Sequence, residues 1–266
     1  MSSIRRLDYF VCGTCINHQQ MIFKKEPAKE LIFPAGVYLI EHAEKGYMLY
    51  DTGYASEVMR PTLRNLAYRL PNPIQMTEAD TIDAQLRAQG IGTEDIGIVF
   101  VSHLHPDHIG RLKAFTKAQF ILTKDCYQTY LKSRFRELVF RDYFPDDFAE
   151  RLIILDLTQK SEVVEGQNCL DVFGDGSVIV YSLDGHARGQ LCLHLPERGI
   201  LLAADTLWRL AFINKLDKMR LIPRFIQQSY PAYLASAQVL KSFLAAGVRV
   251  LVSHEEPARV REVLYG

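Results

Sequence analysis

The sequence predicts an α/β protein with β-sheets in the centre and helices on the outside. Short apolar, β-rich runs alternate with helix-type segments in both halves of the chain, which is the order typical of this class. No internal repeat, low-complexity tract or Gly/Ser-rich linker interrupts the 266 residues, so we expect a single domain over 1–266. That length allows a substantial buried core.

The first half contains four elements with clear sequence signals. Residues 37–41 and 47–50 are β-rich and joined by a short turn, which predicts a hairpin closed by the turn residues 51–53. A helix is expected over 77–90, opened by a capping box and ended by a glycine. The continuous apolar run 96–101 predicts a strand that is buried on both faces.

The second half follows the same logic. Residues 177–183 read as a strand, and 191–195 and 200–204 as a second hairpin. A helix is expected over about 232–246, with leucines and a phenylalanine on one face. It leads into a strand over 248–252.

Four residues that can bind metal ions each follow the end of a predicted strand. They are His103, His186, Asp205 and His254. Loops at the carboxyl ends of strands are where α/β proteins usually carry their chemistry. The repeated placement therefore predicts one shared site.

The segment 101–110 has the strongest chemical signal, because it packs three imidazoles and a carboxylate into six residues. His103 and His105 are two apart, so in an extended loop they point the same way and can share one ion. Asp107 and His108 follow a proline turn and can face a second position. Solvated loop histidines are the alternative, but three of the chain's eight histidines fall here, directly after a buried strand. Imidazole with carboxylate favours zinc, then iron, manganese or cobalt.

The motif at 103–108 resembles the H-x-H-x-D-H motif of the metallo-β-lactamase superfamily. The likeness continues along the chain in Asp51-Thr52-Gly53, Gly185-His186, Ala204-Asp205-Thr206 and Ser253-His254. It implies a four-layer αββα sandwich, with two sheets packed face to face between helices. It also implies that Asp51 supports the metal loop from behind.

The resemblance implies two metal positions. His103, His105 and His186 would hold one ion, Asp107, His108 and His254 the other, and Asp205 would bridge both. The cofactor is then a pair of divalent ions, with Zn²⁺ favoured and Fe or Mn as alternatives. Such a pair can hold a hydroxide as nucleophile, because coordination lowers the pKa of water from 15.7 to about 7. Asp107 is the candidate catalytic residue, since its carboxylate can orient the hydroxide and pass on its proton.

Within the superfamily, the chain is most similar to the N-acyl-homoserine lactonases, in its length and in segments 76–80 and 171–176. This implies a small-molecule substrate, a lactone or related ester, opened by the hydroxide. Two departures concern the substrate side of the site. Trp208 stands where the lactonases have a tyrosine that can hydrogen-bond the substrate carbonyl, and an indole donates only through one N–H. Gln190 stands where the family motif that begins at Gly185-His186 usually ends in a second histidine.

The stretch 206–231 interleaves apolar and basic residues. One interpretation is a lid over an acyl or aromatic substrate that bears a negative charge. The other is a packed helix pair with solvated lysines and arginines. The pattern leaves both open.

Other functions remain as alternatives. A thioesterase of the same fold would use the same hydroxide attack on an acyl thioester. A mono-iron dioxygenase-type oxidoreductase and a metal-holding binding protein belong to different classes. A β-lactamase is disfavoured because those enzymes are secreted and the start of this chain does not resemble a signal peptide. A homodimer is kept as a candidate assembly.

The composition of the chain argues against two classes of binding partner. Lysine plus arginine equals aspartate plus glutamate at 31 each, so no general positive field exists to hold nucleic acid. No stretch reaches the ~18 apolar residues of a transmembrane helix, and we expect no membrane partner. The first twelve residues do not resemble a signal peptide, which predicts a cytoplasmic protein.

Five cysteines at irregular spacing argue against a disulfide framework. Cys12 and Cys15 form a C-x-x-C pattern, but the chain has no second pair to complete a zinc site. We interpret the cysteines as structural residues.

Overall fold

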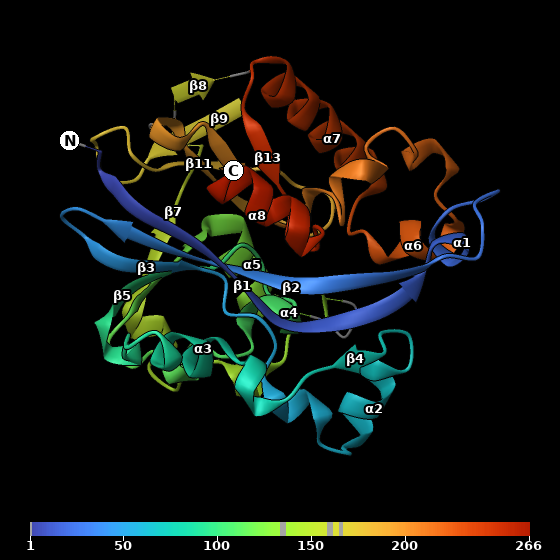
Figure 1. Ribbon diagram of the computed structural model, residues 1–266, viewed down its shortest axis with the longest axis horizontal. Coiled ribbons are helices and arrows are strands. Elements are labelled where there is room, and N and C mark those ends of the chain that lie inside the picture. The colour runs from blue at the N-terminus through green and yellow to red at the C-terminus, as the bar shows by residue number, and fades with distance from the viewer. Residues whose placement is uncertain (1, 134–136, 159–161, 165–166) are drawn as a thin grey trace.

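The computed structural model describes residues 2–133, 137–158, 162–164 and 167–266, and in this part of the chain two β-sheets pack face to face between helices (Figure 1). The strands of the first sheet are, in spatial order, β4 (Ile74–Gln75), β1 (Ile4–His18), β2 (Glu30–His42), β3 (Gly46–Tyr50), β5 (Ile96–Phe100), β6 (Gln119–Thr123) and β7 (Leu152–Leu155). Those of the second are β13 (Arg249–Leu251), β12 (Ile200–Leu202), β11 (Leu191–Leu195), β10 (Ile179–Ser182), β9 (Gln167–Asp171) and β8 (Glu162–Val164).

Most of the α-helices lie outside the sheets, whereas the C-terminal helix adds Val260 to the apolar layer between them. The α-helices are α1 (Gln19–Ile22), α2 (Leu63–Arg69), α3 (Ile82–Ala88), α4 (Pro106–Ile109), α5 (Lys124–Lys132), α6 (Leu221–Ile226), α7 (Tyr230–Ala245) and α8 (Pro257–Tyr265). Helices α3, α4 and α5 contribute Leu86, Ile109 and Cys126 to one apolar cluster against the first sheet, and in Figure 1 α7 lies on the side of the second sheet. Within the described residues, no helix is long and apolar enough to cross a membrane.

Alternating side chains build three apolar layers. In β2, Leu39 packs on the helix side of the first sheet, whereas Ile40 packs between the sheets. In β10, Val180 faces the first sheet, whereas Tyr181 packs with α7. The predicted αββα sandwich is thereby confirmed.

The predicted hairpins are present: β2 pairs antiparallel with β3, and β11 with β12. The strands predicted over 96–101, 177–183 and 248–252 and the helix over 232–246 correspond to β5, β10, β13 and α7. The prediction of one helix over 77–90 was wrong. A 3-10 turn at Glu78–Asp80 is followed by an extended Thr81, and α3 begins only at Ile82. The predicted capping box itself is present, since the Asp80 carboxylate accepts bonds from the backbone N–H and the hydroxyl of Thr77, but the turn that it opens ends where Thr81 becomes extended.

The topology brings strand ends together. Strands β10 and β12 both run antiparallel to β11, and β13 runs parallel to β12, so the carboxyl ends of β10, β12 and β13 share one edge. The Tyr50 hydroxyl donates to the Leu191 carbonyl at 2.6 Å, and Leu191 N–H donates to Ser102 O at 2.8 Å. These bonds join that edge to the end of β5, where the first sheet carries the histidine-rich loop.

The segment 206–231 is not the packed helix pair that was one of the two expectations. It contains 3-10 turns at Leu210–Phe212 and Leu216–Lys218 and then the short helix α6, rather than a helix pair. Phe212, Leu216 and Met219 are buried against the second sheet. Leu221, Ile222 and Phe225 are largely exposed.

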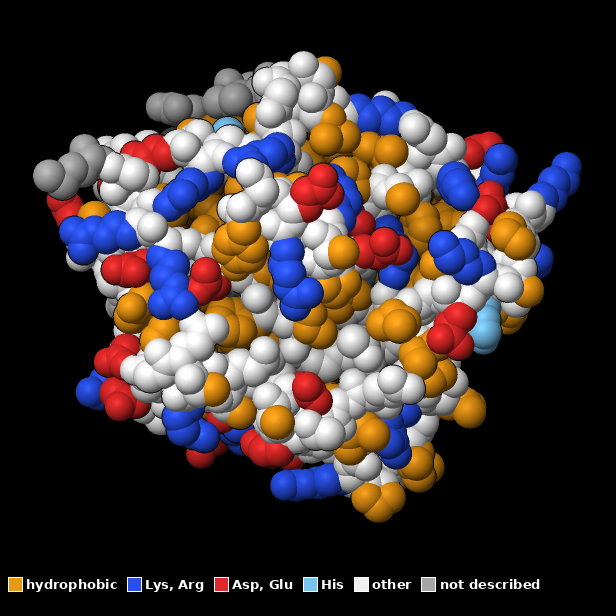
Figure 2. All heavy atoms as spheres, in the orientation of Figure 1, with side chains coloured by type: hydrophobic (Ala, Val, Ile, Leu, Met, Phe, Trp, Pro, Cys, Tyr) orange, Lys and Arg blue, Asp and Glu red, His pale blue; other side chains and the backbone are white. Residues whose placement is uncertain are grey.

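All five cysteines are free thiols, and all but Cys15 are buried. Cys12 and Cys15 lie on β1 and pack against the apolar layers, as expected for structural residues. On the face shown in Figure 2, acidic and basic side chains are mixed, in line with the balanced charge.

Candidate metal centre

The loop after β5 is fixed by backbone contacts to the turn after β3. Thr52 N–H donates to His108 O at 2.7 Å, and Gly110 N–H donates to Gly53 O at 2.9 Å. A Cβ at Gly110 would lie 2.2 Å from Ala55 N, so only glycine allows this approach. The Asp51–Gly53 turn and α4 are therefore locked together, and α4 presents Asp107 and His108 inward.

Three imidazoles meet at one point of the cluster. His105 Nδ1 lies 3.0 Å from His103 Nε2 and 3.0 Å from His186 Nε2. Ligands of one tetrahedral zinc, with Zn–N of 2.0–2.1 Å, lie about 3.3 Å apart. These three nitrogens therefore have the spacing of ligands of a single ion.

A second group lies beside the first. Asp107 Oδ2 is 3.6 Å from His108 Nε2 and 3.6 Å from His254 Nε2. Asp205 stands between the groups: its Oδ2 is 3.3 Å from His186 Nε2 and 3.1 Å from His254 Nε2. The structure thus brings together all seven residues that the sequence singled out as metal ligands.

The chemistry of the cluster fits a pair of bound cations. His108 Nε2 and Asp205 Oδ1 are buried, 3.6 Å apart, and neither has a hydrogen-bond partner among the described residues. Buried polar atoms normally have partners, because leaving one unsatisfied costs about 1–3 kcal/mol. Cations bound among these imidazoles and carboxylates would satisfy both atoms.

A further layer of hydrogen bonds orients the imidazoles. The Asp51 carboxylate accepts from His108 Nδ1 at 2.7 Å, and the Pro34 carbonyl accepts from His254 Nδ1 at 2.8 Å. His103 Nδ1 lies 3.0 Å from the Ser102 hydroxyl. Such partners fix which ring nitrogen faces the metal.

The fourth such partner, Gln227, could not be identified from the sequence pattern. Its Oε1 lies 2.9 Å from His186 Nδ1, although 41 residues separate the two in the chain. A glutamine in a stretch of apolar and basic residues gives no local signal. Only the fold brings it to His186.

The pKa values of the buried histidines shift in different directions. Burial, together with the neighbouring imidazoles, lowers the pKa of His103 and His105 well below its ordinary value. Burial also disfavours a charged His108, but Asp107, Asp51 and Asp205 outweigh it and raise its pKa to about 10. These shifts favour neutral His103 and His105, the form in which imidazole binds metal.

An open cavity of about 260 Å³ reaches the first group. Its lining comprises His103, Leu104, His105, Cys126, Thr129, Glu137, His186, Ala187, Arg188, Ile226 and Gln228. The ring of Trp208 stands edge-on to His186, with 6.3 Å between centroids. Gln190 is fully buried instead, and its amide donates to Leu183 O and to the Thr206 hydroxyl. Trp208 therefore borders the site, whereas Gln190 braces the loops that carry His186 and Asp205.

A family model confirms the resemblance. The model of the metallo-β-lactamase superfamily matches residues 33–246. The chain belongs to this superfamily. The match includes every residue of the cluster except His254.

Individual members of the superfamily match either a shorter part of the chain or most of it at a lower identity. The N-acyl homoserine lactonase AiiA of Bacillus thuringiensis subsp. kurstaki is 33% identical over 135 residues, which are 48% of this chain and 52% of that protein. The match therefore spans about half the length of that relative. The N-acyl homoserine lactonase AttM of Azorhizobium caulinodans is 26% identical over 237 residues, 85% of this chain and 83% of that protein.

Solved structures show the same fold. A variant of AiiA from B. thuringiensis, with N-decanoyl-L-homoserine bound at its active site, has a TM-score of 0.71 at 21% identity and covers 98% of this chain and 96% of its own. A probable metal-dependent hydrolase from Staphylococcus aureus has a TM-score of 0.73 at 15% identity, with 96% and 91% covered.

Proposed function

We propose that this member of the metallo-β-lactamase superfamily is a hydrolase that uses two divalent ions, most favourably Zn²⁺, to open a lactone or related ester. The observation that carries the proposal is Asp205, whose carboxylate lies within 3.3 Å of His186 in the first group and 3.1 Å of His254 in the second. One carboxylate between two ligand groups is the arrangement that a two-ion site needs. Imidazole and carboxylate ligands favour zinc.

The residues of the cluster would then have separate roles in ion binding and proton transfer. His103, His105 and His186 would hold the first ion, Asp107, His108 and His254 the second, and Asp205 both. Bound together, such ions supply Lewis acidity and lower the pKa of a coordinated water to about 7. Asp107 contacts His108 and His254 of the second group, so its carboxylate can receive a proton there and release it to a leaving group.

The lactone assignment is supported by the similarity to N-acyl homoserine lactonases and by the cavity beside His103, His105 and His186. Trp208 borders the first group, where its indole N–H can donate to a substrate carbonyl but cannot transfer a proton in catalysis. We therefore assign orientation, rather than proton transfer, to Trp208.

A thioesterase is the second candidate, and the polar cavity lining favours it. Thr129, Glu137, Arg188 and Gln228 line the cavity together with a few apolar residues, so a leaving group with charged or hydrogen-bonding parts fits there. A mono-iron site is disfavoured because Asp107, His108 and His254 form a complete second ligand group.

We also propose that residues 1–266 form one domain and that 206–231 borders the substrate. The apolar layer between the sheets contains both Ile4 and Val260, from near the two ends of the chain, which supports one folding unit. Ile226 and Gln228 line the cavity, which supports a lid role for the end of α6 and the turn after it.

Metal analysis and a substrate panel test the proposal. We expect two zinc ions per chain in a colourless protein, and ring opening of acyl-homoserine lactones measured as acid release in a pH-stat. Aryl lactones and acyl thioesters complete the panel. Cleavage of thioesters with every lactone intact would replace the lactone assignment by the thioesterase. One iron per chain in a coloured sample would refute the two-ion hydrolase.

A further inference from the structure

Gln227 links helix α6 to the metal ligand His186. It lies in the turn between α6 and α7 and is 1% exposed. Among the cluster histidines, His103, His108 and His254 direct Nδ1 to Ser102, to Asp51 and to a backbone carbonyl. His186 instead depends on a neutral side chain from a distant segment.

The orientation of the Gln227 amide follows from its second partner. Its other end lies 3.0 Å from the Pro223 carbonyl in α6, and a carbonyl can only accept a hydrogen bond. The NH₂ group must therefore face Pro223, and Oε1 must face His186. This removes the usual ambiguity between the oxygen and nitrogen of an amide.

The tautomer of His186 follows in turn. Oε1 can only accept, so the proton of a neutral His186 sits on Nδ1, at 2.9 Å. The lone pair of Nε2 then points into the cluster, 3.0 Å from His105 Nδ1 and 3.3 Å from Asp205 Oδ2. A backbone carbonyl of α6 thus sets the nitrogen that His186 offers to an ion.

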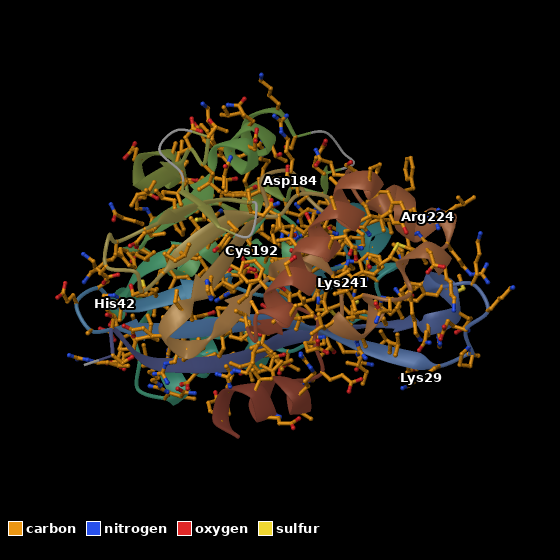
Figure 3. The ribbon with its side chains drawn as sticks, turned by 90° about the horizontal axis from the view of Figure 1, so that it is seen from above. Lys29, His42, Asp184, Cys192, Arg224 and Lys241 are labelled. Atoms are coloured by element: carbon orange, nitrogen blue, oxygen red, sulfur yellow. The ribbon has the colours of Figure 1, made fainter. Side chains whose placement is uncertain are left out.

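Backbone contacts make this link stiff. Gln228 N–H donates to His186 O at 3.2 Å, and Ser229 N–H donates to Gly185 O at 3.0 Å. The Ser236 hydroxyl of α7 donates to Asp184 O at 2.6 Å, at the start of the same loop, and Figure 3 shows Asp184 beside α7. The His186 loop and the α6–α7 turn therefore hold one another in place.

We propose that Gln227 is a positioning residue that raises ion affinity at the first position and couples it to the order of α6. The inference rests on the proposed two-ion function. Loss of a hydrogen-bond partner behind a metal ligand typically weakens binding about 10–100-fold. The coupling is reciprocal, so an ion at the first position stabilises α6 to the same degree.

The test compares substitutions at Gln227 in the His254→Ala background, where the second ligand group is incomplete. Zn²⁺ affinity is measured by competition with a chromophoric chelator. Gln227→Leu and the shorter Gln227→Asn are expected to weaken binding about 10–100-fold. Gln227→Glu keeps the acceptor for His186 Nδ1 but loses the donor to the Pro223 carbonyl, so it should bind Zn²⁺ more tightly than Gln227→Leu. Gln238→Leu, the same change at an exposed position of α7 outside the cavity, is the matched control and should leave affinity within twofold.

Hydrogen exchange of the full chain provides the second readout. Zn²⁺ should slow exchange of the backbone amides over 221–229, and Gln227→Leu should remove most of that protection. Unchanged affinity in both Gln227→Leu and Gln227→Asn, or an equal loss in Gln238→Leu, would overturn the positioning role. Wild-type protein that binds no Zn²⁺ would overturn the proposed function itself, which is a separate result.

Discussion

Asp51 is the residue whose replacement should weaken one ion position and spare the other. Its carboxylate is fully buried and accepts three hydrogen bonds: from Ser102 N–H at 2.8 Å, from the Ser102 hydroxyl at 2.7 Å and from His108 Nδ1 at 2.7 Å. The perturbation is Asp51→Asn, which preserves size and removes one acceptor oxygen.

Asparagine cannot satisfy all three donors. If its NH₂ group faces Ser102 N–H, two donors oppose each other and a charge-assisted bond worth about 1.5–3 kcal/mol is lost. If the NH₂ group faces His108 instead, His108 must accept through Nδ1 and carry its proton on Nε2, the nitrogen that would bind the ion. Either arrangement should weaken the second position about 10–100-fold, or about 1.4–2.8 kcal/mol.

The assay is Zn²⁺ competition with a chelator, read as two successive ions. Asp51→Asn should lower the affinity of the ion held by His108 and leave the other within a few fold. Asp83→Asn removes another buried carboxylate and serves as control, with lower stability and unchanged ion affinity. If Asp51→Asn retains both ions at wild-type affinity, the reasoning about the His108 tautomer is refuted.

Four other expectations follow from the same contacts. His103→Ala combined with His105→Ala should abolish the first ion while metal analysis still finds the second; full retention of both would refute the ligand assignment. Gly185→Ala should destabilise the fold by about 2–6 kcal/mol in chemical denaturation, since its φ is +132° and a Cβ would lie 2.2 Å from Tyr233 N. Burial alone would raise the pKa of Asp83, but two 2.7 Å bonds from Arg111 outweigh it and lower the pKa. Because the folded pKa is below the unfolded value of about 3.9, the pair's stabilisation is present at neutral pH and is lost as the pH falls below about 4; Asp83→Asn should flatten that part of the urea-midpoint profile. Trp208→Tyr should raise lactone turnover in the pH-stat, because a phenol can donate a proton as well as a hydrogen bond; an unchanged rate would refute that role for the position.

Local signals predicted the parts of the site that are local in the chain. The histidine-rich loop is six residues long and follows a buried strand, so both its chemistry and its position were readable. His186, Asp205 and His254 were readable because each follows a strand, and the carboxyl ends of β10, β12 and β13 share one edge. These strands could be predicted because hydrophobic periodicity is a local property of the sequence.

Features set by tertiary contacts were not readable. Strand β1 is 15 residues long, but its buried and exposed positions do not alternate regularly, because it bulges between Val11 and Thr14 as it pairs with β2. The helix pattern over 77–90 did not indicate that the backbone becomes extended at Thr81, between the 3-10 turn and α3. Gln227 reaches His186 only through the fold, so no spacing rule could identify it.

The division of the ligands between the sheets has a thermodynamic consequence. His103, His105, Asp107 and His108 follow β5 of the first sheet, whereas His186, Asp205 and His254 follow strands of the second. Each proposed ion position therefore draws on both sheets: the first needs His186, and the second needs His254. An unfolded chain cannot hold these residues together, so ion binding adds directly to folding stability. One ion at a free concentration of 100 Kd contributes about 2.7 kcal/mol. Since total stabilities are about 5–15 kcal/mol, the ions would be a principal link between the two halves of the sandwich.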